Sequence, residues 1–105
     1  NVVLRDRKVL SEDGIFIVAI TVNRREKKII AKARVHTRGF VYLKKSRDIL
    51  RESTELVNQT VEDYLQGEEF DWAELKGKVR DNLAKFLFDQ TKRRPAILPV
   101  VMEAK

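Results

Sequence analysis

The hydrophobic pattern of the chain has a period of two in its first part. Residues 15–22, IFIVAITV, are rich in β-branched side chains and apolar at both alternating sets of positions, which predicts a strand buried on two faces. Residues 28–36 alternate between apolar positions such as Ile29 and Val35 and basic positions such as Lys32, so they predict a hairpin partner with one wet, basic face. The segment GFVYL, residues 39–43, is predicted to be a third strand.

The period then changes to that of a helix. Residues 46–66 carry apolar side chains at helical spacing and end before Gly67, which predicts an amphipathic helix of about five turns. A second helix is predicted over residues 72–91, because Asp71 and Glu74 have the spacing of a capping box.

A last strand is predicted at residues 96–102, AILPVVM. Pro99 cannot donate a hydrogen bond to a ladder, so this strand is expected at a sheet edge. The predicted order is βββααβ. The fold class is therefore α+β: a small, mostly antiparallel sheet of three to four strands with two antiparallel helices on one face.

Composition restricts the class of protein further. A chain of 105 residues has room for one domain. It has no cysteine, which suits a reducing compartment, and its longest apolar run, residues 15–20, is too short to span a bilayer, so we expect a soluble, cytoplasmic protein. The first residue is Asn and the pattern starts abruptly, which indicates a piece of a longer polypeptide.

Catalytic residues are scarce. His36 is the only histidine, and no cysteine or carboxylate lies close to it in the sequence, so neither a nucleophile–base pair nor a metal site is expected there. The four glycines are dispersed, which excludes a glycine-rich phosphate loop. We therefore expect no catalytic, cofactor or metal-binding residue in this chain.

The net charge of +6 favours polyanionic partners. Basic residues gather at several predicted connections, which suggests a broad positive field and no single groove. The candidates for contact with an RNA backbone are Arg24, Arg25, Lys44, Lys45, Lys92, Arg93 and Arg94.

The stretch HTRGFVYLKK, residues 36–45, resembles the signature of an RNA-recognition strand. Arg38, Gly39 and Phe40 fit that signature, but Val41 stands where a small residue belongs. Three strands also precede the first predicted helix, whereas the RNA-recognition fold places a helix after its first strand. The order of elements therefore favours a structural strand over a base-stacking one.

The predicted strands have more apolar surface than two helices can cover. Adjacent helices cover one face of a small sheet, and an uncovered apolar face of several hundred square ångströms indicates an interaction surface. Which alternate set faces the helices is open at this stage. The residues expected to include the interface are Phe16, Val18, Ile20, Phe40, Tyr42, Val100 and Met102.

Three segments together resemble the carboxy-terminal domain of bacterial ribonuclease J, a ribonuclease of the metallo-β-lactamase/β-CASP family. They are NVVLRDRKVLSEDGI, TRGFVY and DWAELKGKVRDNLAKFLFDQTKRRPAILPVVME, and the resemblance covers nearly the whole chain. It implies that residues 1–13 are the end of an interdomain linker and that residues 14–105 are the α+β domain.

The resemblance also implies the function of the whole protein. The parent would be an endo- and 5′-to-3′ exoribonuclease in RNA processing and decay, with two zinc or manganese ions in an amino-terminal lobe, and no residue here carries that chemistry. The implied assembly is a homodimer, a homotetramer or a complex with a paralogous ribonuclease J subunit. The rest of the parent chain is a further implied partner. RNA would be bound through the parent.

The leading hypothesis from the sequence is a non-catalytic oligomerisation and scaffolding domain. The alternative is an autonomous RNA-binding module that uses the basic clusters.

Overall fold

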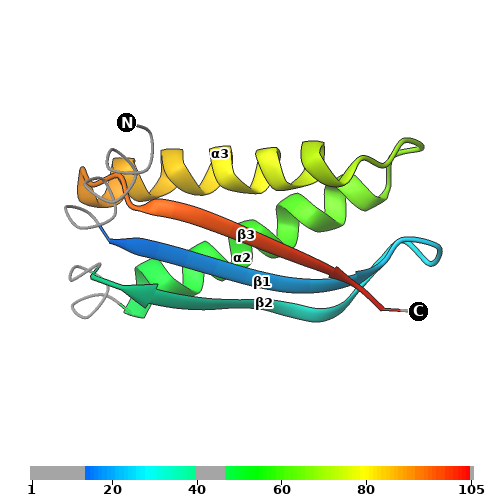
Figure 1. The fold of residues 1–105 in the computed structure, drawn as a ribbon, viewed down its shortest axis with the longest axis horizontal. Helices are drawn as coiled ribbons and strands as arrows, with labels where there is room; N and C mark the ends of the chain where they lie inside the picture. Colours follow the sequence, from blue (N-terminus) through cyan, green and yellow to red (C-terminus); the bar gives the residue numbers. More distant parts are fainter. Residues whose placement is uncertain (1–13, 40–46, 105) are drawn as a thin grey trace, which may run out of the picture.

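The computed structural model describes residues 14–39 and 47–104. The elements follow the predicted order and bounds closely (Figure 1): β1 Ile15–Asn23, β2 Lys28–Arg38, α2 Arg47–Leu65, α3 Trp72–Thr91 and β3 Ala96–Glu103. The predicted linker at residues 1–13, and residues 40–43 of the predicted third strand, lie outside the described ranges.

The three described strands form one sheet in the order β2-β1-β3. β1 pairs with β2 in the antiparallel direction and with β3 in the parallel direction, so the sheet is mixed and not mostly antiparallel as predicted. The cause is the path of the chain: every connection reverses direction, and after four reversals β3 runs the same way as β1 (Figure 1). β3 is an edge strand, which confirms the position expected from Pro99.

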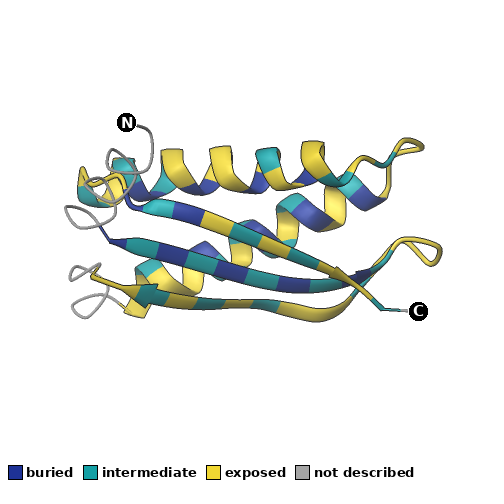
Figure 2. Cartoon of the chain, in the orientation of Figure 1, coloured by how far each residue is buried: buried dark blue, intermediate teal, exposed yellow. Residues whose placement is uncertain are grey.

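The molecule has two layers, with α2 and α3 together on one face of the sheet. Alternate residues of β1, namely Phe16, Val18, Ile20 and Val22, are buried against the helices (Figure 2). The helices contribute Val57, Val61, Leu65, Leu75, Val79, Leu83 and Leu87 to the same core. Each such side chain stabilises the fold by about 1.5–3 kcal/mol when it is fully buried.

Local hydrogen bonds fix both ends of α3. The Asp71 side chain accepts hydrogen bonds from the backbone N–H groups of Ala73 at 2.8 Å and Glu74 at 3.3 Å, as predicted for the cap of this helix. The Asp71 N–H, which a complete capping box gives to the glutamate, donates to Tyr64 Oη at 2.9 Å. At the other end Lys92 adopts a left-handed conformation with φ of 59°, and its N–H donates to the Phe88 carbonyl at 2.7 Å. The chain then turns directly into β3.

Gly39 lies where two backbone segments approach closely. Its φ is +71°, and a Cβ placed on it would lie 3.3 Å from the Cα of Gly14. The Gly14 carbonyl in turn accepts a hydrogen bond from the Ala96 N–H at 2.9 Å, at the start of β3. A side chain at Gly39 would therefore strain this junction.

A side chain from α2 supports β2 where the strand pairing is irregular. The register shifts between Ala19 and Thr21, because these residues pair with Arg34 and Ala31, so that two residues of β2 stand opposite Ile20 alone. One of those two residues is Ala33, and its N–H donates to Asn58 Oδ1 at 2.8 Å. Asn58 therefore satisfies a backbone donor at the bulge and holds β2 against α2.

Replacing Asn58 with Ala is expected to lower the free energy of unfolding by about 1–3 kcal/mol, because the partly buried Ala33 N–H loses its acceptor. Asn58→Asp is the matched control, since it keeps an oxygen in the same place and should lose less. Urea unfolding followed by circular dichroism measures both. Equal losses for the two variants would show that the hydrogen bond is not the cause.

Candidate functional site

The sheet face opposite the helices is the candidate functional site, and we call it the open face. It consists of the strand positions that alternate with the core positions and lie in register across the sheet. These are Ile15, Ile17, Ala19 and Thr21 of β1; Arg34, His36 and Arg38 of β2; and Leu98, Val100 and Met102 of β3. Both described helices lie on the other side of the sheet (Figure 1).

One half of the open face is apolar. Leu98, Val100 and Met102 on β3 are 48%, 41% and 47% exposed, although they lie within a regular strand. Leu98 pairs with Ile17, and Val100 pairs with Ala19, so the exposed side chains of β3 adjoin the half-buried ones of β1. The result is a continuous apolar strip along β1 and β3.

The other half of the open face is cationic. Arg34, His36 and Arg38 are exposed and follow one another at alternate positions of β2. They pair with Ala19, Ile17 and Ile15, so they run beside the part of the apolar strip between Ile15 and Ala19. None of the strand positions named above as the open face is a carboxylate, and its fixed charges are therefore all positive.

The structure places three of the residues predicted for the interface in the core of the chain. Phe16, Val18 and Ile20 are 0%, 1% and 2% exposed and pack against the helices within the chain. The sequence could not assign the faces of β1, because both alternating sets of the strand are apolar. Ile15 and Ile17, on the other alternating set, take their place on the open face.

The remaining predicted interface residues are on the open face or outside the described ranges. Val100 and Met102 lie on the open face, while Phe40 and Tyr42 fall within residues 40–46. Leu98 was missed, although its spacing of two residues from Val100 places it on the same face of a strand. Arg34 and His36 belong to the predicted wet face of β2, whereas Arg38 lies beyond the predicted end of that strand at residue 36. The position of these residues beside the apolar strip depends on strand order.

The predicted RNA-contacting residues do not form one site. Arg24 and Arg25 follow the end of β1, whereas Lys92, Arg93 and Arg94 precede β3, whose first residue pairs with the first residue of β1. The two clusters therefore lie at opposite ends of a nine-residue strand, about 30 Å apart. Lys44 and Lys45 lie outside the described residues.

Several of these cations have partners within the chain. Arg24 Nε lies 3.1 Å from Glu103 Oε2, and its guanidinium carbon is 5.8 Å from the centre of the Phe70 ring. Lys92 and Arg94 both lie over the Phe88 ring, at 5.3 Å and 4.6 Å from its centre. Arg93 donates its backbone N–H to Thr91 Oγ1 at 3.1 Å. These cations therefore take part in contacts within the chain.

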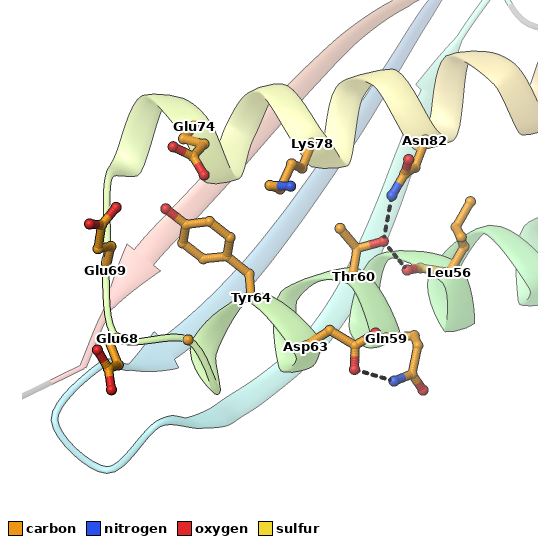
Figure 3. A pocket seen from close by; sticks show the side chains of 11 residues that line it. Leu56, Gln59, Thr60, Asp63, Tyr64, Glu68, Glu69, Glu74, Lys78 and Asn82 are labelled. Atoms are coloured by element: carbon orange, nitrogen blue, oxygen red, sulfur yellow. Dashed lines mark hydrogen bonds between the residues drawn. The ribbon is translucent and has the colours of Figure 1, made fainter.

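A groove between α2 and α3 is lined mainly by acidic side chains (Figure 3). Asn82 Nδ2 donates to Thr60 Oγ1 at 3.0 Å across the groove, and Gln59 Nε2 donates to Asp63 Oδ1 at 2.8 Å. The charged groups that line it are Asp63, Glu68, Glu69, Glu74 and Lys78. Four carboxylates against one lysine make this groove unsuited to an RNA backbone.

Within residues 14–39 and 47–104, no group of three or more His, Cys, Asp or Glu side chains is placed to hold a metal ion. The two metal ions expected for the parent therefore have no fitting group of side chains in the described part of this chain. None of the described helices is long and apolar enough to cross a membrane.

Comparison with known proteins places these features in a family. Residues 2–104 match the family described as the ribonuclease J C-terminal domain. The chain is 76% identical over its full length to ribonuclease J 2 of Streptococcus pyogenes and 48% identical over 98% of its length to ribonuclease J 2 of Staphylococcus aureus. It spans about a fifth of these relatives, 19% and 18% of their respective lengths. The chain therefore belongs to the ribonuclease J C-terminal domain family.

Proposed function

We propose that this chain is the non-catalytic assembly domain of a ribonuclease J. The parent would hydrolyse RNA as an endonuclease and a 5′-to-3′ exonuclease, with two zinc or manganese ions in an amino-terminal lobe, and this domain would hold its catalytic bodies in a fixed relation. The observation that carries the proposal is the open face, where Leu98, Val100 and Met102 are exposed on a regular strand.

The energetics of the open face favour a covering partner. Each large apolar side chain gains about 1.5–3 kcal/mol on going from full exposure to burial, so three half-exposed side chains and their half-buried neighbours provide a substantial driving force for docking. A second copy, a paralogous subunit and the rest of the parent chain are the partners implied by the family. Each of these partners would cover the open face and bury its apolar side chains.

The double change Leu98→Gln and Val100→Thr, made in the full-length polypeptide, tests this role. The two replacement side chains fit in a strand but have less apolar surface. We therefore expect the assembly to be weaker. The expected result is a lower mass in sedimentation or faster proteolytic release of the domain. Unfolding of the 105-residue chain should shift by no more than about 0.5 kcal/mol, because both positions are exposed in it.

Leu50→Gln is the matched control for this experiment. Leu50 is an apolar side chain that is 38% exposed on α2, outside the open face. It should leave both the mass and the proteolysis rate unchanged. If the open-face variant also behaves as the wild type in both measurements, the proposed assembly role is wrong.

An autonomous RNA-binding module is the second candidate function. The observation that favours it is the pair Arg34 and Arg38, which presents positive charge along one strand of the open face. Against it stand the separation of the other basic clusters and the pairing of Arg24 with Glu103. An auxiliary contact with phosphates, without reading of sequence, is the form that these residues support.

Titration of the 105-residue chain with fluorescent single-stranded RNA at two salt concentrations separates the two functions. For an assembly domain we expect negligible binding at about 0.15 M salt, where only strong phosphate contacts survive screening. Binding with a Kd of about 1 μM or tighter and a steep salt dependence would favour the RNA-binding module.

A further inference from the structure

The charges of the open face restrict what can cover it. Arg34 and Arg38 lie on the same face of the sheet as Leu98 and Val100, two strands away, with no carboxylate among the open-face positions. A partner that covers the whole face removes water from both the apolar strip and the arginines. Such a partner has to supply carboxylates for the arginines as well as apolar side chains for the strip.

The same face of a second copy does not meet this requirement. When two sheets face each other across a two-fold axis parallel to the strands, β2 of each copy lies over β3 of the other, which sets Arg34 and Arg38 against apolar side chains. When the axis runs across the strands, β2 lies over β2 and arginines meet arginines. Both arrangements leave buried cations without a counter-charge.

A symmetric contact limited to the apolar strip is small. Specific protein interfaces bury about 800 Å² on each partner, with about 20–30 residues a side. The strip offers Leu98, Val100 and Met102 with the half-buried edge of β1. Stable docking therefore needs the cationic half of the open face as well.

We propose that the open face docks an acidic, apolar surface from another region of the parent ribonuclease J. This inference rests on the proposed assembly function and names the partner of the same face. The relatives are about five times longer than this chain, since it spans 19% and 18% of them, and the remaining polypeptide is the source of the partner surface.

The spacing of the two arginines on β2 indicates which side chains the partner surface carries. Arg34 and Arg38 are four residues apart on one strand, so their Cα atoms are about 13 Å apart. Two carboxylates at a matching distance can each accept a paired hydrogen bond from a guanidinium. Apolar side chains beside them then contact Ile17, Leu98 and Val100 across the strip.

Photo-crosslinking in the full-length polypeptide tests this inference. A benzoylphenylalanine at position 100, Val100→p-benzoylphenylalanine, reports what touches the open face. A mixture of isotopically light and heavy protein distinguishes contacts within a chain from those between copies. The expected product joins position 100 to a peptide outside the present chain that contains both carboxylates and apolar residues.

The arginines are tested by a charge change with a matched control. Arg34→Gln with Arg38→Gln should lower the cross-link yield about tenfold, which corresponds to about 1.4 kcal/mol of docking free energy. Lys76→Gln with Lys85→Gln removes the same charge from exposed positions on α3, away from the open face, and should leave the yield unchanged. Equal cross-link yields in the wild type, the arginine variant and the lysine variant would show that the partner surface is not acidic.

The other products distinguish failure of this inference from failure of the assembly function. Cross-links between position 100 and the open face of a second copy would overturn the acidic partner while leaving the assembly function in place. Cross-links to RNA, or to no macromolecule, would overturn both.

Discussion

One constraint determines the structure: β1 has two apolar faces, but the two helices form a single layer that covers only one of them. β1 is apolar at both alternating sets of positions, and α2 and α3 pack together on one side of it. That arrangement buries Phe16, Val18, Ile20 and Val22, but it leaves β3 with half-exposed leucine, valine and methionine side chains on the other side. A domain built in this way buries one face of its sheet and leaves apolar side chains exposed on the other.

The two outer surfaces of the domain differ in charge as well as in apolar content. The groove between the helices presents four carboxylates and one lysine, whereas the open face presents arginines beside an apolar strip. Contacts of the helical layer with polyanions are disfavoured by this pattern, and contacts of the open face with acidic protein surfaces are favoured. The net charge of +6 thus says less about partners than does its distribution between the surfaces.

Sequence patterns predicted the elements well because local signals determine them. The capping of α3 by Asp71 and the edge position imposed by Pro99 both follow from the chemistry of single residues. The face of β1 that meets the helices could not be predicted, since Phe16 and Ile17 are equally apolar and only packing separates them. The neighbour of β3 in the sheet was also not predicted, and the parallel pairing of β3 with β1 places Val100 in line with Ala19 and Arg34.

Oxidation of Met102 gives the most direct test of the account. It is the only methionine of the chain and is 47% exposed on the open face, so its reaction with peroxide reports directly on access to that face. The account predicts rapid oxidation in the isolated 105-residue chain and oxidation slower by about tenfold or more in the full-length protein, because a docked surface would exclude the oxidant. Equal rates in the two proteins would contradict the claim that this face is covered in the assembled ribonuclease.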